Sequence, residues 1–134
     1  MKEVLKHEKG VGLAAPQIGI SKRVIIVDTG EEFFALLNPV VVEKSKEKVR
    51  TKEGCLSVKG VWFEVERAKR VVVRAVNKEG QKLEIEAENI LSVIVQHEID
   101  HLNGKLFIDG AKFFPKIKMI ISHLFQKYYA KKPR

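Results

Sequence analysis

More than any other segment, residues 88–104 constrain how this 134-residue chain can fold. The pattern of this segment is helical, and apolar residues occupy almost every side of its first half, at Ile90, Leu91, Val93, Ile94 and Val95. A helix that is apolar all round needs other elements to cover it. We therefore expect this helix to be buried at the centre of the fold and to end near Gly104.

The later part of the same helix carries His97, Glu98 and His101. Residues four apart lie on one face of an α-helix, so the two imidazoles can bind one metal ion while Glu98 stands beside it as a base. Such an ion would lower the pKa of a bound water molecule and make it a nucleophile at neutral pH. The spacing predicts metal-assisted hydrolysis.

A catalytic site of this kind needs a third protein ligand. The metzincin pattern would place a histidine at Phe107, and a thermolysin-like enzyme would need a later glutamate, but none follows Glu98. Asp100, Asp109 and His123 remain on that side, in contexts that do not favour ligation. We therefore expect the third ligand upstream of the helix, and we disfavour a general metalloprotease.

The lone cysteine, Cys55, is the candidate for that ligand. It lies in the sequence Glu-Gly-Cys-Leu-Ser at residues 53–57, a polar break between two strand-like stretches. A single buried cysteine is more often an inert small apolar residue, but this setting favours ligation. A Cys-His-His set suits a borderline-soft divalent metal such as Fe(II), Zn(II), Ni(II) or Co(II).

The segments before the helix have the patterns of antiparallel strands. They are rich in β-branched and apolar residues or alternate apolar with polar positions. We expect a short helix at residues 2–9 and strands at residues 23–28, 33–37, 40–42, 61–66, 71–76 and 82–87. The last two strands flank a four-residue turn and form a hairpin. The prediction is an α+β fold with antiparallel sheets around the buried helix.

The C-terminal segment combines an apolar stripe with most of the net charge of +8. From Pro115 the apolar residues recur at spacings of three and four, which predicts an amphipathic helix. They are Ile117, Ile120, Ile121, Leu124, Phe125 and Tyr128. No acid follows Asp109, whereas seven Lys and Arg residues do. By default this is a solvated basic face, and the alternative is contact with an anionic partner.

Composition indicates one domain, residues 1–134, in a reducing compartment. A chain of this length with 45% hydrophobic residues can bury a single core. No signal peptide and no bilayer-spanning apolar run is visible. A lone cysteine cannot form an internal disulfide. We expect a cytoplasmic protein without a membrane partner.

Three separated motifs together resemble those of the peptide deformylases, in the same order. They are Gly-Val-Gly-Leu-Ala-Ala-Pro-Gln at residues 10–17, Glu-Gly-Cys-Leu-Ser at residues 53–57 and Gln-His-Glu-Ile-Asp-His-Leu-Asn-Gly at residues 96–104. The first also fits a dinucleotide-binding fingerprint, but it lacks the preceding strand, and Pro16 falls where the following helix should be established. The resemblance spans residues 10–109.

The resemblance implies removal of the formyl group from the N-terminal formylmethionine of nascent polypeptides. It implies one divalent metal per chain held by Cys55, His97 and His101, with Fe(II) native and Zn(II), Ni(II) or Co(II) as substitutes. Because deformylases act on nascent chains, the ribosome surface is the anionic partner that the basic C-terminal helix could contact.

The resemblance also implies catalytic roles for three residues. Glu98 would take a proton from the water that attacks the formyl carbon and then pass it to the leaving amine. The Gln17 amide and the Leu56 N–H would stabilise the oxyanion. Apart from the resemblance, the position of Asp100 beside the two histidines predicts that it accepts a hydrogen bond that orients a ligand imidazole, and a solvated carboxylate is the alternative.

Five residues are expected to bind the substrate. Val11 and Gly12 lie where a strand-like edge can receive the peptide backbone. Ile90, Val93 and Ile94 precede His97 on the same helical face and, with Val11, could line an apolar pocket for the methionine side chain.

The chain also differs from the family pattern. Members normally have a strand and a long first helix before the Gly-x-Gly motif, so an adapted fold or a second subunit is expected to cover the surface left by the short N-terminus. Lys59 stands where a proline is usual, and Trp62 where a substrate-contacting basic residue is sometimes found. The alternative function is a deformylase-like ribosome-binding protein without turnover, although the retained Glu98 and Gln17 argue against it.

Overall fold

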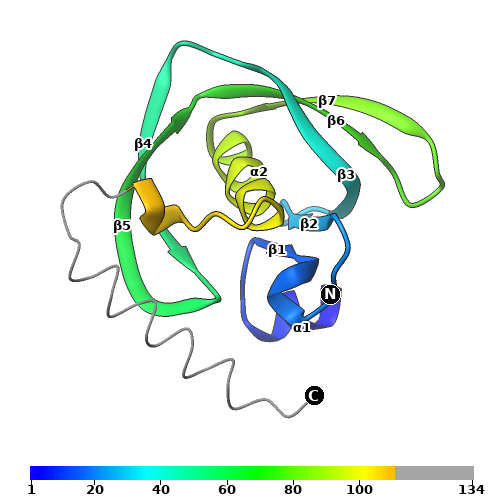
Figure 1. Ribbon diagram of the computed structural model, residues 1–134, viewed down its shortest axis with the longest axis horizontal. Coiled ribbons are helices and arrows are strands. Elements are labelled where there is room, and N and C mark those ends of the chain that lie inside the picture. The colour runs from blue at the N-terminus through cyan, green and yellow to red at the C-terminus, as the bar shows by residue number, and fades with distance from the viewer. Residues whose placement is uncertain (111–134) are drawn as a thin grey trace.

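Helix α2, Asn89–Leu102, lies at the centre of the fold, as its apolar pattern predicts (Figure 1). The computed structural model describes residues 1–110. Val93, Val95 and Ile99 of this helix are at most 5% exposed. Antiparallel strands lie around it, so the predicted α+β arrangement is confirmed.

Two antiparallel sheets and three short helical segments make up the rest of the described chain. One sheet has the strand order β1 (Gly12–Ala14), β2 (Val24–Asp28), β3 (Phe33–Lys44), β6 (Arg70–Val76) and β7 (Lys82–Glu88). The other pairs β4 (Lys48–Cys55) with β5 (Val58–Ala68). The helical segments are α1 (Lys2–His7), the 3-10 turn η1 (Ala15–Ile18) and the 3-10 turn η2 (Phe107–Gly110).

Strand β3 differs from the sequence prediction. A break was expected at Asn38 and Pro39, but the strand continues through both residues to Lys44. Asn38 adopts a left-handed conformation with φ of 49°, and the pairing register with β6 shifts between Leu37 and Val40. The irregularity therefore interrupts the register without ending the strand.

The apolar core lies between α2 and the inner face of the larger sheet. Ile25, Val27, Val71 and Val73 are at most 1% exposed and belong to one cluster with Val95 of α2. Burying a side chain of this size contributes about 1.5–3 kcal/mol. The core thus fixes one side of α2 against the larger sheet. The opposite side of α2 faces the β4–β5 hairpin.

Buried polar contacts hold the rotational position of α2. Ser92 Oγ donates a hydrogen bond to the Ala68 carbonyl over 2.8 Å, and Gln96 Nε2 donates to the same carbonyl over 2.9 Å. Both side chains are at most 5% exposed. Ser92 and Gln96 lie on successive turns of α2 and bond to the same residue of β5. These two bonds therefore fix the rotation of α2 so that His97 and His101 face β4.

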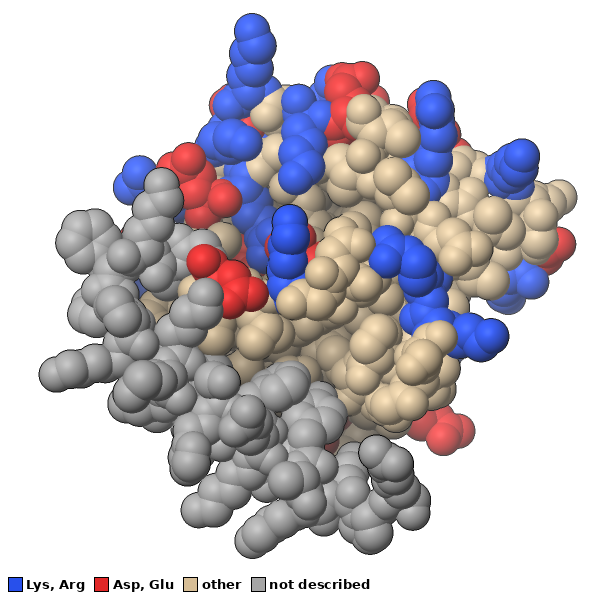
Figure 2. All heavy atoms as spheres, in the orientation of Figure 1, with Lys and Arg blue, Asp and Glu red and all other residues tan. Residues whose placement is uncertain are grey.

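Figure 2 shows charged side chains at the surface, with Lys and Arg gathered over the end of the fold formed by β3 and β4. No helix within residues 1–110 is long and apolar enough to cross a membrane. The predicted C-terminal amphipathic helix lies outside the described residues. It stays a prediction, as do the single domain over residues 1–134 and the covering subunit.

Candidate active site

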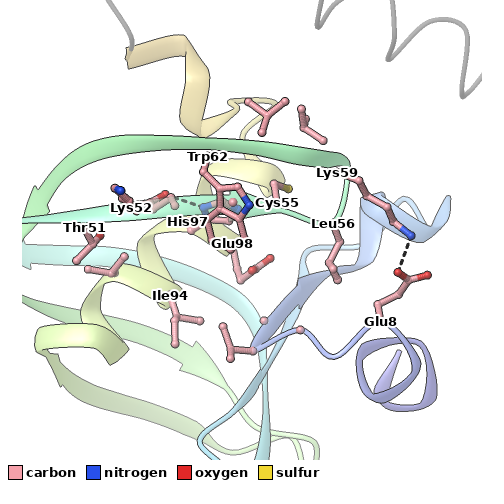
Figure 3. Close-up of a pocket in the computed structure, with 18 of the residues that line it drawn as sticks. Glu8, Thr51, Lys52, Cys55, Leu56, Lys59, Trp62, Ile94, His97 and Glu98 are labelled. Carbon is pink, nitrogen blue, oxygen red and sulfur yellow. Dashed lines mark hydrogen bonds and ion pairs between the residues drawn. The ribbon is translucent and has the colours of Figure 1, made fainter.

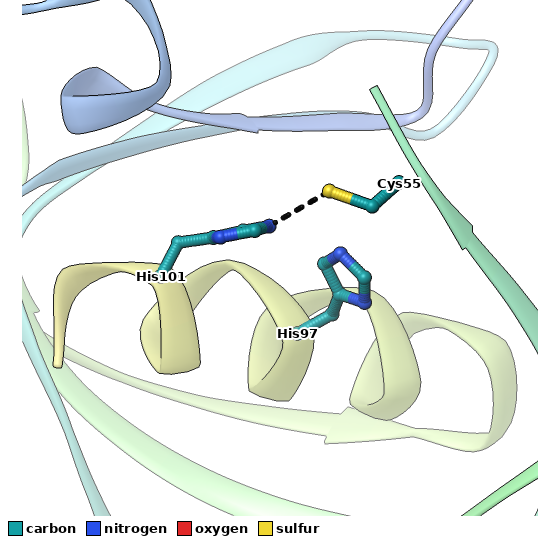
Figure 4. Close-up of side chains that lie close together, drawn as sticks. All are labelled: Cys55, His97 and His101. Atoms are coloured by element: carbon teal, nitrogen blue, oxygen red, sulfur yellow. Dashed lines mark hydrogen bonds between the residues drawn. The ribbon is translucent and has the colours of Figure 1, made fainter. Parts of the chain in front are cut away.

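Three potential metal ligands meet between α2 and the end of β4. Cys55 is the last residue of β4, at a register shift in its pairing with β5, and His97 and His101 lie on successive turns of α2. The potential ligand atoms of all three lie within 4.8 Å of one another, and Cys55 Sγ lies 3.1 Å from His101 Nε2 (Figure 4). One thiolate and two imidazoles in this arrangement suit a divalent metal with a further position for water.

The surroundings of Cys55 favour its thiolate. Burial raises the pKa of the thiol, but hydrogen bonds with His101 and His97 outweigh burial and lower the pKa to about 5. The Ser57 N–H also donates to Sγ over 3.4 Å. The thiolate is the form that binds metals, so Cys55 is in its ligating form at neutral pH.

His97 is oriented by a buried carboxylate. Its Nδ1–H donates to Glu53 Oε2 over 2.8 Å, which leaves Nε2 for a metal. Burial lowers the pKa of His97, but its contacts with Cys55 and Glu53 raise the pKa to about 10. The imidazole therefore holds a proton that metal binding would release.

Arg67 compensates the charge of Glu53. It donates from Nε to Oε1 over 2.5 Å and from Nη2 to Oε2 over 2.9 Å, and its Nη1 donates to Asp100 Oδ2 over 2.7 Å. Glu53 is 6% and Arg67 8% exposed. The hydrogen bond to an imidazole that was expected of Asp100 is thus made by Glu53, and Asp100 contacts Arg67 instead. Sequence reasoning missed the roles of Glu53 and Arg67, although Glu53 stands in the cysteine motif.

Glu53→Gln should weaken metal binding by about 10- to 100-fold, because the amide neither pairs with Arg67 nor orients His97 as the carboxylate does. Competition with a chelator of known affinity measures this. The matched control is Glu64→Gln, the same change at an exposed position of β5, and it should leave the affinity unchanged. Equal affinities for both variants would contradict the role of Glu53.

Glu98 lies beside the three candidate ligands and is 5% exposed. Its Oε2 is buried and has no hydrogen-bond partner within residues 1–110. Burial raises the pKa of Glu98 to about 7, against the lowering effect of His97 and His101. Gly12 allows β1 to pass close to this carboxylate, because a Cβ at Gly12 would lie 2.5 Å from Glu98 Oε1.

The Gln17 side chain points its nitrogen toward the candidate metal ligands. The Ala14 N–H donates to Gln17 Oε1 over 2.7 Å, which fixes the amide. Its Nε2 lies 3.1 Å from Ser57 Oγ and 3.5 Å from Cys55 Sγ. Leu56 occupies the turn directly after Cys55, and its side chain packs beside Leu5 and Leu13. The structure thus places both Gln17 and Leu56 beside Cys55.

A cleft of about 460 Å³ opens from this site between the β4–β5 hairpin, β1 and α2. All five residues expected to bind substrate line it: Val11, Gly12, Ile90, Val93 and Ile94. Two large apolar side chains of its lining are exposed, Trp62 at 68% and Ile90 at 64%, beside charged residues such as Lys52 and Lys59. Figure 3 shows Lys59 and Glu8 joined across one end of the cleft, where Lys59 Nζ lies 2.6 Å from Glu8 Oε2.

Cys55→Ala should lose most of its bound metal, because two imidazoles alone make a weaker site than three ligands. Elemental analysis of purified protein should give close to one metal ion per chain for the original and well below one for the variant. Full occupancy in the variant would show that Cys55 is not a ligand.

Comparison with known proteins agrees with this geometry. Residues 1–116 match the model of the family described as polypeptide deformylase. A peptide deformylase of Carboxydothermus hydrogenoformans is 52% identical over 83% of this chain and 72% of the relative, and one of Desulfitobacterium hafniense is 50% identical over 84% and 74%. The crystal structure of peptide deformylase from Thermotoga maritima matches with a TM-score of 0.79 and 45% identity, over 81% of this chain and 74% of that one. A Met-Ala-Ser-bound deformylase of Acinetobacter baumannii matches with a TM-score of 0.77 and 39% identity, over 81% and 75%.

Proposed function

The chain belongs to the polypeptide deformylase family of metallohydrolases, and we propose that it removes the formyl group from the N-terminal formylmethionine of nascent polypeptides. The sequence-based prediction of a peptide deformylase is confirmed by the family match. The observation that carries the substrate proposal is Glu98, a carboxylate buried at the candidate metal ligands with one unpartnered oxygen, at the floor of a peptide-sized cleft.

We propose one divalent metal per chain, bound by Cys55 Sγ and by one nitrogen each from His97 and His101. Fe(II) is proposed as the native metal, with Zn(II), Ni(II) and Co(II) as substitutes, because the thiolate and imidazole donors suit this group of ions. When bound, the metal supplies Lewis acidity for the formyl carbonyl and for water.

Glu98 serves as general base and then as general acid. A pKa of about 7 lets the carboxylate accept the proton of the attacking water and lets the resulting acid donate it to the leaving amine near neutral pH. Within the described residues, Oε2 of this carboxylate makes no hydrogen bond that would compete for the proton. A protein that only bound peptides would gain nothing from burying this carboxylate, which argues against the alternative without turnover.

The oxyanion that forms on the formyl oxygen is stabilised by two donors, the Gln17 amide and the Leu56 N–H. The bond from Ala14 to Gln17 Oε1 fixes the amide so that its nitrogen faces the reacting centre. A donor fixed before the reaction needs no reorganisation when negative charge develops. Gln17 is therefore proposed as a catalytic residue, not only a cleft residue.

The substrate backbone is proposed to lie along the edge formed by Val11 and Gly12, as an added strand. Its methionine side chain enters the apolar part of the cleft at Ile90, Val93 and Ile94. Support comes from the lining of the cleft and from the related Acinetobacter baumannii enzyme, whose crystal structure holds Met-Ala-Ser.

The direct test is release of formate from formyl-Met-Ala-Ser by protein loaded anaerobically with Fe(II) or Ni(II). Glu98→Ala should keep the metal but lose more than the roughly 10²–10⁴-fold typical of general acid–base catalysis, because the attacking water also loses its orientation. Glu88→Ala, an exposed glutamate just before α2, is the control and should remain active. Near-normal turnover by Glu98→Ala would refute the assigned role.

Iron-loaded enzyme should lose activity in air, as the metal and Cys55 oxidise, whereas nickel-loaded enzyme should persist. Parallel activity time courses in air and under argon measure this difference. If both metal forms have equal lifetimes in air, Cys55 and its metal are not the vulnerable pair.

We further propose that the chain acts in the cytoplasm and that its basic C-terminal segment directs it to ribosomal RNA near the peptide exit. Neutralising Lys116, Lys118, Lys127, Lys131 and Lys132 should weaken ribosome binding in a salt-dependent way and leave activity on a short formyl peptide unchanged. The control neutralises five exposed lysines elsewhere, Lys44, Lys46, Lys48, Lys78 and Lys82. Equal co-sedimentation of all three proteins with ribosomes at low salt would mean that the segment is only a solvated face.

A further inference from the structure

Phe107 is a buried aromatic residue that packs against a candidate metal ligand. After α2 the chain turns at Gly104, with φ of 69°, and runs across to the β4–β5 hairpin, where Phe107 begins η2 (Figure 1). The ring centroids of Phe107 and His97 lie 5.7 Å apart, with 27° between the ring planes. Stacked aromatic pairs have separations in this range. The position where a metzincin carries its third ligand therefore holds, in this chain, a ring that stacks on His97.

Phe107 is itself held by the hairpin that carries Cys55. It belongs to a buried apolar cluster with Val58 and Ile108, against which Cys55 and Phe63 pack. The ring centroids of Phe63 and Phe107 lie 6.2 Å apart. One side chain thus contacts both the cluster beside Cys55 and the helix that carries the two histidines.

The hydrogen bond with Glu53 does not by itself fix the plane of the His97 ring. Such a bond weakens steeply only when its angle at the hydrogen falls below about 120°, so the ring can tilt by some tens of degrees and keep the bond. A metal needs the lone pair of Nε2, which lies in the ring plane, to point toward it. Glu53 therefore decides which nitrogen is left for the metal, and a flat neighbour is needed to fix the plane.

We propose that Phe107 is a positioning residue that fixes the plane of the His97 ring for metal binding. The inference rests on the proposed function, which makes His97 a ligand. The ring of His101 lies 4.9 Å away at 69°, but it is a candidate ligand on the same helix and gives no independent support. The stack with Phe107 holds the imidazole in place beforehand, so less side-chain freedom is lost when the metal binds.

The experiment measures the affinity for Co(II), by competition with a chelator, in the original protein and two leucine variants. Phe107→Leu keeps an apolar side chain and removes the flat ring. Phe63→Leu is the matched control, because Phe63 packs in the same cluster and, within residues 1–110, its ring contacts that of Phe107 and not that of His97. The affinity should fall roughly three- to ten-fold in Phe107→Leu, as expected for a lost aromatic stack, and stay near the original in Phe63→Leu.

The visible absorption spectrum of bound Co(II) gives a second readout, which a general loss of packing would not change. Its ligand-field bands depend on the directions of the ligand atoms, so they should shift or broaden in Phe107→Leu and not in Phe63→Leu. Urea unfolding of the metal-free proteins checks that each variant is folded. Phe107→Met, which also lacks the ring, takes the place of Phe107→Leu if the latter does not fold.

An unchanged spectrum in the Phe107 variant would overturn the inference, whatever its affinity. Equal changes in the Phe107 and Phe63 variants would also overturn it, because loss of packing in the shared cluster would then explain both. If the original protein bound no Co(II), the metal site of the proposed function would be refuted, and the inference with it.

Discussion

The buried pairing of Arg67 with Glu53 is the interaction that lets a polar metal centre lie inside an apolar fold. Glu53 holds the His97 imidazole, and its charge would be costly at 6% exposure without the guanidinium beside it. Removing one partner of such a buried pair typically costs about 3–5 kcal/mol. Since Arg67 also contacts Asp100, it connects β5, β4 and α2 at the point where the candidate ligands meet.

The rest of the site depends on how closely the elements around α2 approach one another. Ser92 and Gln96 set the rotation of α2 against β5, and Gly12 lets β1 pass over Glu98. Trp62 folds across Gly54 in the same hairpin, where a Cβ would lie 2.9 Å from the indole. The cleft is therefore shaped by close approaches of the backbone that only glycine permits at these two positions.

The central helix and its ligands could be predicted from the sequence because their signals are local. Two histidines four residues apart on an apolar helix can be recognised without knowing how the strands pair. Cys55 could be recognised because it is the single cysteine of the sequence and a thiolate is a metal ligand. The Glu53–Arg67 pair could not be predicted, since it depends on the register of β4 against β5 and on which face of the hairpin meets α2. Strand β4 was not predicted, because its first residues are charged and its side chains alternate between exposed and partly buried. The length of β3 was underestimated, because Asn38 and Pro39 are residues that usually end a strand.

The central claim is that Cys55, His97 and His101 together hold one metal ion. X-ray absorption spectroscopy at the metal edge of zinc-loaded protein tests it directly, because sulfur and nitrogen scatter differently and lie at different distances. The account predicts one sulfur at about 2.3 Å with two imidazole nitrogens at about 2.0–2.1 Å, and loss of the sulfur shell in Cys55→Ala. A spectrum of the original protein fitted by nitrogen and oxygen alone would contradict it.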